Sequence, residues 1–214
     1  MSQAVFSPCD YVMRVTDTQP KPLTKDMFLS LIGGMDTKFN TEKVREHSST
    51  SEAWKRNLPA VTWQSRFGGE ARRDVNASAT GLYCLDIDIH HEQKFKDICA
   101  FEGVPAAYKW AEEEAVRRAK LWTEMAKREE IEEPQKDALG IVGIHISPSG
   151  TGLHVIALCS GSCHTIAEDQ KRLASLLDTE YDEVCKDAAR IFFIAPKEDW
   201  YYLDLETLFQ YEED

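Results

Sequence analysis

Two aspartates, Asp86 and Asp88, lie two residues apart in the otherwise apolar run GLYCLDIDIHH (81–91). In a β-strand, both carboxylates would point to one face, while Leu85 and Ile87 would point to the other. Neighbouring carboxylates repel each other and raise one pKa unless a cation lies between them. Because Mg²⁺ and Mn²⁺ prefer oxygen ligands, the pair predicts a divalent-metal clamp. A strand end where both groups reach water or an arginine fits the same short pattern.

The segment SPSGTGLH (147–154) has the composition of a phosphate-binding loop. Its hydroxyl groups can donate hydrogen bonds, and its glycines let backbone N–H groups approach an anion closely. The histidine that follows could donate to a phosphate, or it could be a satisfied polar group on a strand. The candidate phosphate-binding residues are Ser147, Ser149, Gly150, Gly152 and His154.

Two further acids and an arginine lie in YDEVCKDAARIFFIA (181–195). Asp182 and Asp187 could each bring another carboxylate toward the metal. Arg190 begins an apolar strand, where it could pair with either acid or with a phosphate, or form a salt bridge that only holds the turn. Arg72 and Arg73, which precede the aspartate strand, are candidates for phosphate or template contacts.

The remaining histidines have simpler interpretations. His145 lies between isoleucines and is expected to be structural. His90 and His91 could be extra metal ligands, but the pattern favours a polar strand end.

The cysteine distribution favours reduced thiols over a disulfide framework. Cys159, Cys163 and His164 form the one tight cluster of possible zinc ligands. A structural zinc site needs four ligands and the sequence shows no fourth, so zinc is not expected here.

The chain of 214 residues has a net charge of −12, which argues against a protein whose whole surface binds nucleic acid. Residues 38–73 differ, because their basic side chains outnumber the acidic ones. This segment is either a local surface for an anionic ligand or a solvated polar face. The beginning of the sequence lacks a signal-peptide pattern, and no run approaches the roughly 18 apolar residues of a membrane span, so a cytoplasmic protein without membrane contact is expected.

Local patterns predict a mixed α+β fold that positions these residues. Thr24 can cap the first helix, and Thr165 with Glu168 can form a capping box for the last one. The predicted helices cover 22–34, about 51–57, 104–130 and a segment after Thr165; the predicted strands cover 58–64, the aspartate run, 141–146, 153–158 and 190–195.

The ordered set LDID (85–88), SPSGTGLH (147–154) and YD (181–182) resembles the three motifs of the archaeo-eukaryotic primase superfamily, which includes primase–polymerases. More narrowly, residues 55–196 resemble the primase-like N-terminal module of Bacteroides-type VirE and replication proteins. The resemblance implies an RRM-like central sheet with flanking helices and a split catalytic core. Residues 1–75 would form an N-terminal α/β lobe of this core, and residues 76–214 a metal- and nucleotide-binding lobe with a helical insertion at about 100–135.

The resemblance also implies metal binding by Asp86, Asp88 and a third acid, Asp182 being preferred over Asp187. His154 and its loop would contact the phosphates of an incoming nucleotide. The implied function is nucleotide transfer to a primer or nascent strand with Mg²⁺ or Mn²⁺, in replication of a mobile element or plasmid. The implied partners are a single-stranded DNA template, nucleoside triphosphates and a possible helicase.

Two alternatives stay open from the sequence. One is a non-catalytic relative that binds nucleotide or DNA. The other is a different enzyme with paired aspartates, such as a nuclease or a nucleotide-sugar transferase.

Overall fold

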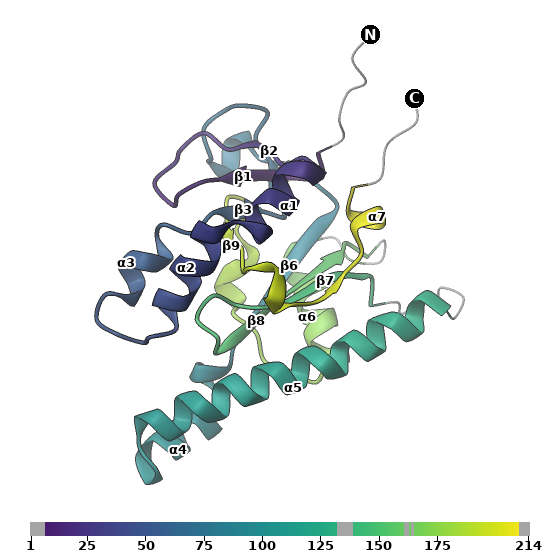
Figure 1. The fold of residues 1–214 in the computed structure, drawn as a ribbon. Coiled ribbons are helices and arrows are strands. Elements are labelled where there is room, and N and C mark those ends of the chain that lie inside the picture. The colour runs from purple at the N-terminus through teal and green to yellow at the C-terminus, as the bar shows by residue number, and fades with distance from the viewer. Residues whose placement is uncertain (1–6, 132–138, 161–162, 164, 210–214) are drawn as a thin grey trace.

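The structure, a computed structural model, describes residues 7–131, 139–160, 163 and 165–209. The described residues form a mixed α+β fold, as the sequence predicts (Figure 1). Two four-stranded antiparallel sheets hold most of the strands.

The central sheet carries the aspartates. Its strand order is β10-β7-β8-β6. The predicted strands 141–146 and 153–158 pair as the hairpin β7–β8, and β6 pairs with β8 along its whole length. This pairing places Asp86 opposite His154 and Asp88 opposite Gly152. The bounds are β6 Leu82–Asp88, β7 Ile141–Ile146, β8 Gly152–Leu158 and β10 Trp200–Leu203.

Helices cover one face of the central sheet. The long helix α5 (Val104–Ile131) runs across this face, with α4 (Gln93–Phe101) beside its first turns (Figure 1). A stripe of alanines lets α5 pack closely on the strands; Ala107, Ala111, Ala115, Ala119 and Ala126 are buried, together with Trp122. Val104, the first residue of α5, is exposed. Helix α6 (Ile166–Leu176) packs on β6.

The second sheet, of order β2-β1-β3-β9, contributes to a separate apolar cluster that includes residues from the other face of the central sheet. Strand β3, from the first part of the chain, pairs with β9 near its end. Within the predicted strand 190–195, Phe192 and Phe193 are the residues that pair with β3. The bounds are β1 Asp10–Val12, β2 Lys21–Pro22, β3 Ala60–Thr62 and β9 Phe192–Phe193; β4 (Ser65–Arg66) and β5 (Ser78–Ala79) form a small extra ladder.

The helices of the first part of the chain lie beside the second sheet (Figure 1). Thr24 caps α1 through its side chain, and Thr165 with Glu168 forms the predicted capping box of α6. The sequence patterns missed α2, in which apolar residues are few, and also α4. The bounds are α1 Lys25–Gly33, α2 Met35–Val44, α3 Ser51–Lys55 and α7 Leu205–Leu208, with 3₁₀ turns η1 Asp74–Asn76, η2 Ile89–His91, η3 Glu183–Lys186 and η4 Lys197–Asp199.

Among the described residues, no helix combines the length and the apolar character that crossing a membrane would require.

Candidate functional site

A cavity of about 770 Å³ lies where the polar end of β6 meets β9 and α3. It gathers residues that are far apart in the sequence, because the central sheet supplies one wall and the N-terminal segments supply another. Eight of the predicted site residues line it: Asp86, Asp88, Ser147, Ser149, His154, Asp187, Arg190 and Arg72.

A row of polar side chains crosses the central sheet from Asp86 to His154 and His145. Asp86 Oδ1 lies 3.4 Å from His154 Nε2. Burial opposes ionisation of Asp86, but the charge and hydrogen bond of His154 outweigh it and lower the pKa of this carboxyl to about 2. Asp86 is therefore a carboxylate at neutral pH, although little of its side chain meets solvent.

The two histidines of this row differ in their surroundings. His145 is fully buried, its ring lies 4.3 Å from that of Trp200, and burial keeps its pKa well below the usual value, which agrees with the expected structural role. His154 lines the cavity, and its Nδ1 is buried without a hydrogen-bond partner among the described residues. A buried ring nitrogen without a partner is unusual and makes His154 a candidate for a functional role.

Asp182 lies beside Asp86. Its backbone N–H donates to the Asp86 carbonyl oxygen over 2.9 Å. The Cys185 thiol lies between the two carboxylates, 3.4 Å from Asp86 Oδ2 and 3.4 Å from Asp182 Oδ2. Burial and the charge of Asp86 raise the pKa of this thiol, so it donates as S–H. Ligand atoms of the three residues lie within 4.8 Å of one another, as a metal site requires.

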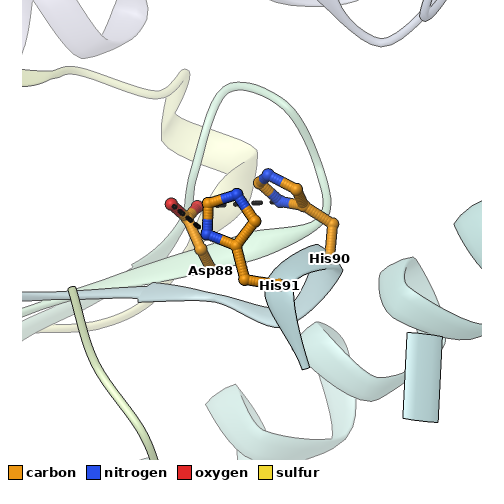
Figure 2. Close-up of side chains that lie close together, drawn as sticks. All are labelled: Asp88, His90 and His91. Carbon is orange, nitrogen blue, oxygen red and sulfur yellow. Dashed lines mark ion pairs between the residues drawn. The ribbon is translucent and has the colours of Figure 1, made fainter. Parts of the chain in front are cut away.

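Asp88 ends β6 and contacts two imidazoles instead. Figure 2 shows Asp88, His90 and His91 turned toward one another. Asp88 Oδ1 lies 3.8 Å from His90 Nδ1, and its Oδ2 lies 3.7 Å from His91 Nδ1. Burial and the charge of Asp86 raise the pKa of Asp88, while burial lowers the pKa of His90. The repulsion between the two aspartates is thus present in the fold, as the sequence predicts.

The loop between β7 and β8 is a tight turn. Gly150 has a φ of +80°, and its N–H donates to the Ser147 carbonyl over 2.9 Å, so this N–H serves the turn. A Cβ at Gly152 would lie 2.5 Å from the Ile87 carbonyl oxygen, so only glycine fits there. Neither glycine lines the cavity. Ser147, Pro148 and Ser149 of the turn line the cavity, and the hydroxyls of the two serines lie 2.9 Å apart.

Arg45 fastens this turn to the rest of the fold. Its guanidinium binds both carboxylate oxygens of Asp199, at 3.2 and 2.7 Å, and Nη2 lies 3.4 Å from the Ser147 carbonyl oxygen. A bidentate pair of this kind fixes orientation as well as distance.

Four cations lie in the cavity wall. Arg72 donates to the Ala189 carbonyl over 2.9 Å, while its Nε is buried and has no partner among the described residues. Arg190 lies 3.7 Å from Asp182 Oδ2. Lys55 lies over the Phe193 ring, 5.4 Å from its centroid. The fourth cation is Arg56.

Arg73 does not line this cavity, and its side chain is exposed. Arg72 is thus the member of the arginine pair that the fold brings to the site.

Sequence reasoning missed Lys55, Arg56 and Cys185 as site residues. The basic excess of residues 38–73 was the signal for the first two. Nothing in the sequence indicated that the Cys185 thiol would contact Asp86.

The predicted alternatives for the third acid lie in different places. Asp182 is next to Asp86, whereas Asp187 lines the cavity and accepts from Gln64 and Arg190 through its backbone carbonyl. All six cysteines are free thiols. The candidate zinc ligand His164 lies outside the described residues.

Comparison of the chain with models of protein families, with curated proteins and with solved structures found no match. Function must therefore be argued from the site itself.

Proposed function

We propose that the protein is a nucleotidyltransferase that adds nucleotides to a primer or nascent DNA strand with the help of Mg²⁺ or Mn²⁺. In this proposal the central sheet is the RRM-like sheet of a split primase-like core, and the protein acts in replication of a mobile element or plasmid. The sequence motifs suggest this assignment, and the geometry of the cavity supports it.

One observation carries the proposal: carboxylates, an imidazole, hydroxyls and cations from separate parts of the chain line a single cavity of about 770 Å³. This volume is in the range of pockets that hold small ligands, roughly 300–1,000 Å³. Acids and cations in the wall of one cavity suit a ligand that carries phosphates and a divalent metal.

The acids fit a divalent metal ion. Asp86 is held ionised, and Asp88 lies close enough to feel its charge. Asp182 brings a third carboxylate within 4.8 Å of Asp86, although the thiol of Cys185 between them is not a ligand that Mg²⁺ favours. When bound there, the ion would supply charge neutralisation at the phosphates and at the attacking hydroxyl.

The chain's own residues then have separate tasks. Lys55, Arg72 and Arg190 neutralise phosphate charge, and the hydroxyls of Ser147 and Ser149 donate hydrogen bonds to phosphate oxygens. His154 is held in place by Asp86 on one side and by the ring of Phe192 on another, 5.7 Å away, so its ring has one orientation in the cavity wall. Catalysis of this kind is mainly positioning and charge stabilisation.

The test is incorporation of labelled nucleotides on a primed single-stranded DNA template, with Mg²⁺ or Mn²⁺. Asp86→Asn should lower the rate by about 100-fold or more, since it removes a charge where charge develops in the reaction. Asp97→Asn is the matched control, because Asp97 is exposed on α4 and bonds only to Gln93 in the described contacts. Activity of the D86N variant at the level of the D97N variant would contradict the proposal.

Binding of nucleotide or template by wild-type protein without any product would favour the non-catalytic alternative. One observation fits that alternative: both carboxylate oxygens of Asp86 already have protein partners, His154 and Cys185. A nuclease or sugar-transferase activity would appear as template cleavage or as turnover of a nucleotide sugar.

Because the net charge is −12, we expect the chain alone to bind DNA weakly and with a steep dependence on salt. In this proposal a helicase partner would raise the affinity for DNA.

A further inference from the structure

Three ligand-type side chains meet where β6 ends and η2 begins. We propose that Asp88, His90 and His91 form a binding site for a divalent transition-metal ion of the Mn²⁺, Co²⁺ or Zn²⁺ class. This site is separate from the pair Asp86 and Asp182, and it shares only Asp88 with the proposed nucleotidyltransferase site.

The distances within this cluster suit a cation better than hydrogen bonds. The contacts from Asp88 to His90 and His91, 3.8 and 3.7 Å, are too long for a hydrogen bond. Ligand atoms of all three residues lie within 4.8 Å of one another. Two atoms that each bind one ion at about 2.1 Å are held about 3–4 Å apart, so small side-chain adjustments complete such a site.

His90 supplies a second observation. Its Nδ1 is buried and has no hydrogen-bond partner among the described residues, although it faces the Asp88 carboxylate (Figure 2). A buried ring nitrogen that points at a carboxylate from just beyond hydrogen-bond distance is satisfied when an ion binds both.

The local fold holds the cluster in place. The Ile89 N–H, within the cluster, donates to the Thr151 carbonyl over 3.2 Å and ties η2 to the hairpin loop. The edge contact of Phe95 with His90, at 6.3 Å between ring centroids, limits the rotation of the imidazole. The ligands therefore depend on backbone geometry that is already fixed without an ion.

An ion can reach this cluster from solvent. The side chain of His91 is 71% exposed. Asp88 and His91 also line a pocket of about 170 Å³ whose wall includes the acids Glu180, Asp182 and Glu183. These acids raise the local concentration of cations.

The donor set determines the class of metal. Imidazole nitrogen is a good ligand for Co²⁺, Ni²⁺ and Zn²⁺ and a weaker one for Mn²⁺, whereas Mg²⁺ prefers oxygen ligands. Two imidazoles and one carboxylate leave further positions for water or for a substrate oxygen. The cluster therefore makes the protein selective for transition metals at this position, whereas Asp86 and Asp182 offer oxygen ligands.

The test is pulsed electron paramagnetic resonance of bound Mn²⁺, which detects nitrogen nuclei bonded directly to the ion. It is done on the full chain without nucleotide. Wild-type protein should show imidazole nitrogen, and His90→Gln and His91→Gln should each weaken this signal and lower the affinity for Mn²⁺ by about tenfold or more. His47→Gln is the matched control, because His47 stacks on Tyr108, 4.1 Å away, and does not belong to the ligand cluster.

Other candidate ligands are removed in turn. Cys159→Ser with Cys163→Ser eliminates binding to these two thiols, and His154→Gln eliminates a nitrogen ligand beside Asp86. Both variants should keep the nitrogen signal. Loss of the signal in H154Q, or its full retention in H90Q and H91Q, would overturn the proposal. Because His91 is mostly exposed, H91Q tests the site without disturbing the core.

This result does not depend on the proposed function, because ion binding is measured without nucleotide or template. Nitrogen coordination without nucleotide incorporation would leave the metal site standing and the nucleotidyltransferase proposal refuted. Incorporation by wild-type protein whose bound Mn²⁺ shows no nitrogen would support the nucleotidyltransferase proposal and refute the metal site.

Discussion

The two faces of strand β6 have opposite chemistry. Leu85 and Ile87 lie in the apolar core under α5 and α6 and are 0% and 1% exposed. Asp86 and Asp88, between and after them, line the cavity on the other face. The same seven residues thus supply both core packing and a polar site.

The cavity face is itself divided along the strand. Leu82 and Cys84 at the beginning of β6 are covered by the apolar cluster of the second sheet. Further along β6, polar and charged groups replace this cover. The helix-covered face of β6 therefore contributes mainly to stability. On the other face, the second half of the strand presents Asp86 and Asp88 to the cavity, where they can bind a ligand.

The strongest test of this division compares neighbours on the two faces. Leu85→Ala should lower the free energy of unfolding by about 2–5 kcal/mol, because it leaves a cavity in a fully buried site. Urea denaturation measures this loss. Under conditions where L85A is folded, its nucleotide incorporation should stay near that of wild type. A catalytic loss as large as that of Asp86→Asn would show that the two faces do not have separate roles.

Substitution of Gly152 tests how closely the backbones of β6 and β8 must approach each other beside the cavity. Gly152→Ala places a Cβ 2.5 Å from the Ile87 carbonyl oxygen and 3.1 Å from Ser147 Oγ, so the β6–β8 pairing must shift. We expect a loss of up to about 3 kcal/mol in unfolding free energy, measured by urea denaturation. Gly33→Ala is the control, since nothing lies within 4 Å of its Cβ position, and it should stay within about 1 kcal/mol of wild type.

The Arg45–Asp199 pair tests whether polar contacts hold the turn at the cavity. Arg45→Met should cost about 1–2 kcal/mol in denaturant unfolding, because Asp199, only 9% exposed, keeps a charge without its partner. The double variant Arg45→Met with Asp199→Asn should cost less, since no charge is left buried. Equal costs for the two variants would show that the pair does not act as a unit.

A weaker effect is expected at the partly buried ion pairs that Glu114 forms with two arginines of α5. Hydrogen bonds from Arg117, followed by those from Arg118, lower the pKa of Glu114 to about 2, against some opposition from burial. A lowered pKa means that the folded state binds this proton less well than the unfolded state. The stability that Glu114 contributes is therefore present above pH 4.5 and is lost as the pH falls toward 2.

Urea denaturation of wild type and Glu114→Gln should differ by less than about 1 kcal/mol at pH 7, and the difference should shrink below pH 4.5. Glu113→Gln is the control, because Glu113 is 68% exposed and lies 3.9 Å from Lys109. A difference that does not change with pH would assign the effect to packing.

The sequence predicted local features well. Alternation along 82–88 identified the strand and the facing of its aspartates, and helical spacing identified α5, because both patterns depend on neighbours only a few residues away. Sequence neighbours did not determine ion-pair partners as reliably. Arg117 lies at i,i+4 spacing from Glu113, yet it binds Glu114, which is three residues away.

The amino-acid order alone was enough to indicate which residues form most strands and helices, where two of the helices are capped, and which face of β6 carries charge. The partners of the charged groups depended on the three-dimensional fold. It placed Asp182 and Cys185 against Asp86 and brought Lys55 to the cavity, whereas the 3₁₀ turn directly after β6, a local feature, turned His90 and His91 toward Asp88. Many of these contacts join segments tens of residues apart, so their distances depend on how the two sheets and their helices pack together.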